Sequence, residues 1–113
     1  MGGTLLAVRE PLSLVARRQG KMLTMIARGE LDAASAPTLT DAVDDALAQG
    51  VIDVLVDCRG MDFADTTGVG ALLVIKTMLE ERGGALILFA PREPVRRAFE
   101  VTGVETTFFV VGE

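Results

Sequence analysis

Residues 51–79 read VIDVLVDCRGMDFADTTGVGALLVIKTML, which is the pattern of a strand, a loop and a helix in succession. Val51 to Val56 is a short apolar run rich in β-branched residues, which indicates a strand covered on both faces, as in parallel sheets. Asp57 to Thr66 is predicted to be a loop, and a helix is predicted to start near Thr67. That helix ends at the stop signal Arg82-Gly83-Gly84. The stretch therefore predicts an α/β fold with a loop at the carboxyl end of a buried strand.

Before this stretch, the sequence predicts a β-hairpin and a first helix. Leu12 to Arg18 alternates as a strand does, and Met22 to Arg28 follows the turn signal Gln19-Gly20-Lys21. The helix is predicted to begin at Ser35 as its N-cap and to end at Gly50. At helical spacing, the inward side chains are Leu39, Val43, Ala46 and Leu47, and the outward ones are Asp41, Asp44 and Asp45.

After this stretch, Ala85 to Phe89 predicts a further buried strand, and Thr107 to Val111 predicts a short last strand. Between them a third helix is predicted to start near Pro94, with inward side chains Val95, Ala98, Phe99 and Val101. The chain, 1–113, is thus predicted to be a single α/β domain with its core over about 12–111. We expect a mixed sheet of four or five strands, with an N-terminal hairpin followed by alternating helices and right-handed crossovers.

Composition excludes several classes of function. The 113 residues carry a net charge of −5, with no histidine and one cysteine, Cys58. Histidine triads and mixed Cys/His zinc sites are excluded, and a basic stripe with stacking aromatics for nucleic acid is absent. No apolar run approaches the roughly 20 residues of a membrane helix, and Met1 to Glu10 shows no secretory signal pattern. We expect a cytoplasmic protein with no metal, no cofactor, no membrane insertion and no direct nucleic-acid contact.

The segment from Asp62 to Gly70 combines chemical groups that a site would use. Two adjacent hydroxyls, of Thr66 and Thr67, follow the Asp65 carboxylate at a predicted helix N-terminus. Unpaired N–H groups there favour an anion, so a phosphate is tolerated by the helix end but repelled by Asp65 and Asp62. Two readings stay open from the residues alone: helix capping by Thr67 with Asp65 helping the dipole, or a regulatory hydroxyl.

Other features favour ordinary structural roles. Gly68 and Gly70 do not belong to a dinucleotide fingerprint and are predicted to let the helix start close to its neighbours. Cys58 follows a buried strand and is expected to be inert packing rather than a redox sensor. The carboxylates Asp57, Asp62 and Asp65 are expected to be solvated rather than to bind Mg²⁺. The cluster Arg92, Arg96 and Arg97 is also expected to be solvated, with a partner contact as the alternative.

Four segments resemble the STAS-domain anti-sigma factor antagonists. Gly29-Glu30-Leu31-Asp32 through Pro37 is similar to the family's "GELD…AP" segment, and Asp65-Thr66-Thr67-Gly68-Val69-Gly70 resembles its "DSSGLG" phosphorylation loop. Arg82-Gly83-Gly84 and the stretch from Pro94 to Val104 resemble the later "GG" and "VxRxFxxTGL" segments. They occur in the family's order and at family-like spacing, and the resemblance runs from about Leu12 to Val110.

The resemblance implies a non-enzymatic switch. In that family an unphosphorylated antagonist binds an anti-sigma factor, itself a serine kinase, and so releases the sigma factor; phosphorylation ends binding and a Ser/Thr phosphatase restores it. Thr66 is then the acceptor, Asp32 lies near it on the same surface, and the partner contacts are Asp32, Asp65, Thr66, Thr67 and Gly68. This chain departs from the family in having Thr where the first hydroxyl is usually Ser. The alternatives are an unphosphorylated STAS scaffold or accessory protein, stressosome- or transport-associated, and a small carboxylate-based enzyme.

Overall fold

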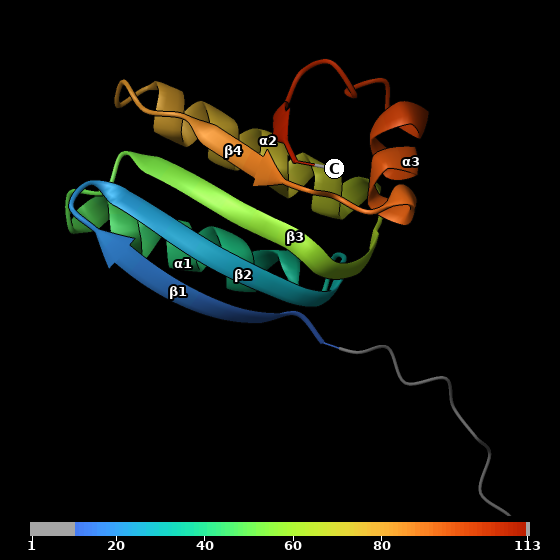
Figure 1. The fold of residues 1–113 in the computed structure, drawn as a ribbon, viewed down its shortest axis with the longest axis horizontal. Helices are drawn as coiled ribbons and strands as arrows, with labels where there is room; N and C mark the ends of the chain where they lie inside the picture. The colour runs from blue at the N-terminus through green and yellow to red at the C-terminus, as the bar shows by residue number, and fades with distance from the viewer. Residues whose placement is uncertain (1–10, 113) are drawn as a thin grey trace, which may run out of the picture.

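The computed structural model describes residues 11–112, and Met1–Glu10, where no secretory signal is expected, lies outside this range. The described chain alternates strands and helices after an initial hairpin (Figure 1). In chain order the elements are β1 Ser13–Gln19, β2 Met22–Leu31, α1 Ala36–Ala48, β3 Asp53–Ala64, α2 Thr66–Glu80, β4 Leu86–Phe89, α3 Glu93–Val101 and β5 Phe109–Val111.

The five strands form one mixed sheet in the order β1-β2-β3-β4-β5. β1 and β2 pair antiparallel across the Gly20 turn, where Gly20 has a φ of 60°. Every later pair is parallel, because a helix returns the chain to the same end of the sheet before each new strand. The predicted mixed sheet with an N-terminal hairpin and alternating helices is confirmed.

β3 is twice as long as the sequence predicted. Most of the predicted loop Asp57–Thr66 is strand, because β2 continues to Leu31 and pairs with β3 as far as Ala64. The polar and glycine residues of this stretch are accommodated by register shifts between Ile26 and Arg28 and between Gly29 and Glu30. The composition of residues 57–64 is typical of a loop, but pairing with the long strand β2 makes this segment a strand. The loop before α2 is therefore reduced to Asp65.

Within residues 11–112, helices cover only one face of the sheet. In Figure 1, α1 and α2 lie behind the strands, and α3 lies beyond the end to which the β4 arrow points. Alternate strand residues such as Met25, Val56 and Leu88 are fully buried towards the helices. The intervening residues, such as Ile26 and Leu55, remain partly accessible on the opposite face. The prediction that the central strand is covered on both faces is therefore wrong, although the helix-facing side is a complete core.

The helix faces were predicted well with one exception. In α1 the four predicted inward side chains are buried and the three aspartates are exposed. In α3, Val95 and Phe99 are buried, and Phe99 contacts Phe108 with 5.0 Å between ring centroids. Val101, predicted to be inward, is 77% exposed. It lies six residues after Val95, a rotation of about 240° around the helix axis, which turns it away from the sheet.

Cys58 lies on the helix-facing side of β3 and is fully buried. Burial and the neighbouring Asp57 carboxylate raise the pKa of its thiol to about 12. The thiol therefore stays neutral and unreactive near neutral pH. We expect a thiol reagent to label native protein about a hundredfold or more slowly than the same protein in guanidinium chloride, since reaction needs transient unfolding. Equal labelling rates in the two conditions would contradict this prediction.

Candidate functional site

The start of α2 is fixed by Asp65. Its backbone is extended, with φ −98° and ψ −177°, and its carboxylate accepts a hydrogen bond of 2.8 Å from the N–H of Gly68. The carbonyl of Asp65 accepts from Val69 N–H at 2.9 Å. Asp65 is thus the N-cap, and the negative charge of its carboxylate lies at the positive end of the helix. The expectation that Thr67 caps the helix is wrong, because an aspartate two residues earlier performs this role.

With the cap supplied by Asp65, both threonine hydroxyls are left available. Thr66 and Thr67 are exposed residues in the first turn of α2. Within residues 11–112 neither side chain makes a hydrogen bond to another protein group. Of the two readings that the sequence left open, capping by a threonine is therefore excluded, and accessible hydroxyls at the helix start remain.

Gly68 brings α2 against the end of β2. It is buried, and a Cβ at this position would lie 2.4 Å from the carbonyl oxygen of Leu31. The prediction that Gly68 permits a close approach is confirmed. Gly70 differs, because a Cβ there would meet no atom within 4 Å, so for Gly70 the same prediction is wrong. Gly68 thus sets the position of the helix start, and a direct contact between Gly68 and a partner stays a prediction.

Asp32 lies beside this helix start because the ends of β2 and β3 are hydrogen-bonded to each other. The N–H of Asp65 donates to the carbonyl of Leu31 at 3.1 Å, and Leu31 pairs with Ala64. The Asp32 carboxylate accepts from the N–H groups of Ala34 and Ser35, both at 3.0 Å. Asp32 and Asp65 therefore follow neighbouring strand ends, and a shared partner surface of Asp32 and Thr66 stays a prediction.

Ser35 is the N-cap residue of α1, as predicted, but its side chain makes no capping hydrogen bond. Its hydroxyl instead donates to the carbonyl of Glu30 at 2.7 Å and accepts from the N–H of Asp32 at 2.9 Å. The residue is buried. These bonds close the turn that holds Asp32 next to the end of β2, so the serine supports the site rather than the helix.

A groove of about 340 Å³ separates the start of α2 from α3. Thr66 and Asp65 line one side of it, and the exposed Val101 lies on the other. The full lining is Phe63, Ala64, Asp65, Thr66, Pro94, Arg97, Ala98, Val101 and Thr102. Sequence analysis offered Arg97 on α3 as a possible partner contact but placed Val101 inward, although the helical rotation of Val101 away from Val95 was a signal that it faces outward.

The charged groups around the groove are mostly engaged in surface pairs. Asp62 pairs with Arg92 at 3.2 Å, and Arg97 pairs with Glu93 at 2.9 Å on α3. Arg96 donates to the carbonyl of Pro91. Such exposed pairs contribute little energy, so a partner can exchange them at small cost.

The three carboxylates considered for Mg²⁺ do not converge. Asp57 pairs with Arg59 at 2.7 Å on the face away from the helices, whereas Asp62 pairs with Arg92 and Asp65 caps α2. Among the described residues, no group of three or more metal-ligating side chains is assembled. None of the helices in the described range combines the length and apolar character needed to cross a membrane.

Comparison with known proteins identifies the family and the fold. The sequence model of the STAS domain family matches residues 13–111. The anti-sigma-B factor antagonist of Listeria monocytogenes is 27% identical over 90 residues, which cover 80% of this chain and 79% of the relative. Two solved structures of the anti-sigma factor antagonist SpoIIAA share the fold. The unphosphorylated form has a TM-score of 0.78 at 22% identity, covering 89% of this chain and 88% of the other. The phosphorylated Bacillus form has a TM-score of 0.71 at 21% identity, covering 89% and 91%.

Proposed function

Because the chain belongs to the STAS domain family, we propose that it is an anti-sigma factor antagonist whose binding is controlled by phosphorylation of Thr66. Relatives named anti-sigma-B factor antagonist and the two forms of SpoIIAA support this assignment. The observation that carries the control step is the exposed, unbonded hydroxyl of Thr66 directly after the capping Asp65. The chain acts as a binding module and as the substrate of a kinase, not as a catalyst.

The proposed partner is an anti-sigma factor of the serine-kinase type. Its contact surface on this chain comprises Asp32, Asp65, Thr66 and Thr67, together with the groove between α2 and α3. Gly68 contributes by holding the helix start against Leu31. The exposed Val101 adds an apolar side chain to this surface, of the kind that protein interfaces bury in their core.

Phosphorylation is proposed to act through charge. A phosphate on Thr66 adds about −1.5 to −2 charge beside the carboxylate of Asp65. In an interface shaped for a neutral hydroxyl, an unpaired charge loses hydration without compensation and costs several kcal/mol. A Ser/Thr phosphatase restores the neutral form. Since sigma factors act on transcription, the proposed site of action is the cytoplasm.

We expect a kinase-type anti-sigma factor to be recovered when the full chain is used as bait, and we expect that kinase with MgATP to add one phosphate, at Thr66. The reason is position: Thr66 directly follows the cap and lines the groove. Mass spectrometry of peptides gives the site. Thr66→Ala should abolish incorporation, and Thr67→Ala, the matched control, should retain it. Phosphate found at Thr67 alone, or undiminished in Thr66→Ala, contradicts the assignment.

A further inference from the structure

The sheet face opposite the helices carries apolar side chains on all five strands, with the Asp57–Arg59 ion pair among them. The register aligns Val15, Ile26, Asp57 and Phe89 in one row across β1 to β4, and Leu55, Ile87 and Phe109 in the next row across β3 to β5. We call this surface the open face. Its apolar side chains are Val15, Ile26, Leu55, Ile87, Phe89 and Phe109. Val15 is 65% exposed, Phe109 63% and Ile26 38%.

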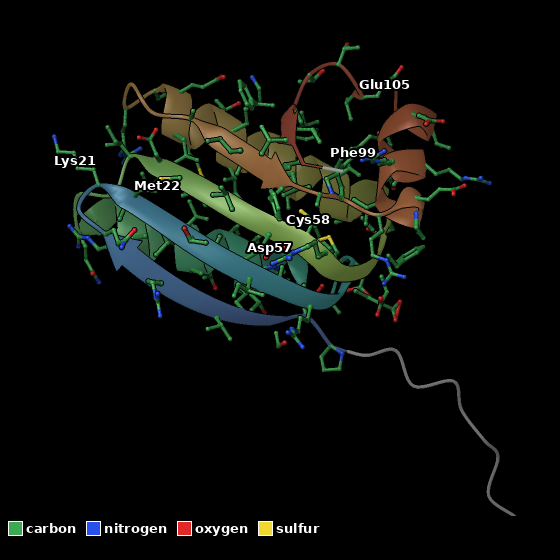
Figure 2. The ribbon with its side chains drawn as sticks, viewed as in Figure 1. Lys21, Met22, Asp57, Cys58, Phe99 and Glu105 are labelled. Carbon is green, nitrogen blue, oxygen red and sulfur yellow. The ribbon has the colours of Figure 1, made fainter. Side chains whose placement is uncertain are left out.

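The only acidic group within these two rows is already neutralised. Asp57 is 6% exposed, and the guanidinium of Arg59 binds its carboxylate at 2.7 Å while lying 5.1 Å from the Phe89 ring centre. This pairing holds the pKa of Asp57 below its ordinary value. Figure 2 shows Asp57 on the side of the sheet turned away from α1 and α2. Because the two charges cancel, the ion pair adds no net charge that would oppose burial of this face.

A hollow of about 450 Å³ adjoins this ion pair. It is lined by Ile26, Arg28, Asp57, Arg59 and Gly60. Three of its five lining residues are charged, so it suits a polar or charged side chain from an opposing surface. A flat sheet face with one such depression offers shape as well as area for recognition.

The dimensions of the open face fit a sheet-to-sheet contact. With strands about 4.8 Å apart and about 3.3 Å per residue, the face measures roughly 24 Å across its five strands, and the strands run from about 10 Å for β5 to about 40 Å for β3. A standard interface covers about 800 Å² of accessible surface on each partner, which is the order that such a face supplies. Two sheets pack face to face when their inner side chains are apolar.

The distribution of charge favours a second copy as the occupant. The chain carries a net charge of −5, and exposed carboxylates lie on the helix side, as Asp41, Asp44 and Asp45 do on α1. On the open face, Arg17, Arg28 and Arg59 accompany Glu30, Asp53 and Asp57, so that positive and negative charges are equal in number there. Two copies that meet through this face bring together their least acidic surfaces and keep their acidic helices apart.

We propose that the open face is the interface of a two-fold symmetric homodimer, in which the sheets of two copies pack against each other. Cyclic dimers with self-complementary contacts are the most frequent oligomers. Thr66 opens α2, which covers the opposite face, so the dimer leaves both proposed phosphorylation sites accessible. This inference does not depend on the proposed function.

Sedimentation velocity of the full chain, from micromolar to millimolar concentration, tests the dimer. We expect a monomer–dimer equilibrium that Val15→Asp and Phe109→Asp each weaken about tenfold or more, because each places a carboxylate in the apolar contact. Both side chains are largely exposed in the monomer, so circular dichroism and thermal melts should show an intact fold. Val74→Asp is the matched control: Val74 is 54% exposed on α2, and its substitution should leave dimerisation unchanged.

Two results would overturn the proposal. One is a chain that remains monomeric at millimolar concentration. The other is a dimer that withstands both open-face substitutions, or that Val74→Asp disrupts instead. Amide chemical shifts followed on dilution locate the interface independently, and changes confined to the helices would contradict a sheet-to-sheet contact.

Discussion

Replacing Gly68 with alanine is expected to destabilise the protein by about 3 kcal/mol, whereas Gly70→Ala, two residues later in the same helix, should stabilise it by about 1 kcal/mol. At position 68 the added methyl group would lie 2.4 Å from the Leu31 carbonyl oxygen and 2.8 Å from its Cγ. Because the contacted atoms are the backbone and the buried side chain of Leu31, the steric clash can be relieved only by moving α2. At position 70 nothing lies within 4 Å, and alanine simply favours the helix.

Denaturant unfolding of the two variants beside the parent protein measures this difference of about 4 kcal/mol. Because both substitutions add the same methyl group to α2, the comparison isolates the contact with Leu31 from helix propensity. A Gly68→Ala variant as stable as Gly70→Ala would show that the helix start does not press against β2. We also expect Gly68→Ala to weaken partner binding, since a displaced helix start carries Asp65 and Thr66 with it.

Thr66→Glu is expected to fold normally and to lose binding to the anti-sigma factor by about 30-fold or more, equivalent to about 2 kcal/mol. The side chain is exposed and makes no hydrogen bond to another protein group within the described range, so the free energy of unfolding should change by less than about 1 kcal/mol. A carboxylate in the first turn interacts favourably with the helix dipole, offset by repulsion from Asp65. In the complex the same charge must be desolvated, so the loss of binding affinity is large.

Titration calorimetry against the recovered anti-sigma factor, with a thermal melt of each variant, gives the two quantities. Thr66→Ala should bind as the parent does. Thr77→Glu is the charge-matched control, because Thr77 is an exposed residue of α2 more than two turns from the groove, and its affinity should be unchanged. A well-folded Thr66→Glu with parental affinity would exclude this surface as the regulated interface.

Features governed by short-range rules were predictable from the sequence. The Gly20 turn with its flanking alternation gave the hairpin, and 3.6-residue spacing gave the buried face of α1. The location of the site between a strand end and Thr66 also followed from the order of elements. These predictions depend on neighbours close in the chain, whose contribution is visible in a single sequence.

The errors arose where distant segments decide the structure. Asp57 to Ala64 is strand because β2 offers a long pairing partner, and no local pattern reports the length of that partner. The open face was missed because Val51 to Val56 is apolar except for Asp53, and the residues alone do not tell which side a helix will cover. Assigning the cap to Thr67 failed for a different reason: aspartate and threonine both serve as N-caps, and the helix start was misplaced by one residue.

The capping of α2 by Asp65 also bears on how this protein can evolve. Since the aspartate supplies the side-chain cap of the first turn, the hydroxyls at positions 66 and 67 are not needed for capping. Loss of either hydroxyl should therefore cost the fold little and matter mainly for what the surface must do. Variation between serine, threonine and residues without a hydroxyl at position 66 across descendants of this gene would therefore record gains and losses of regulation, largely undisturbed by selection for stability.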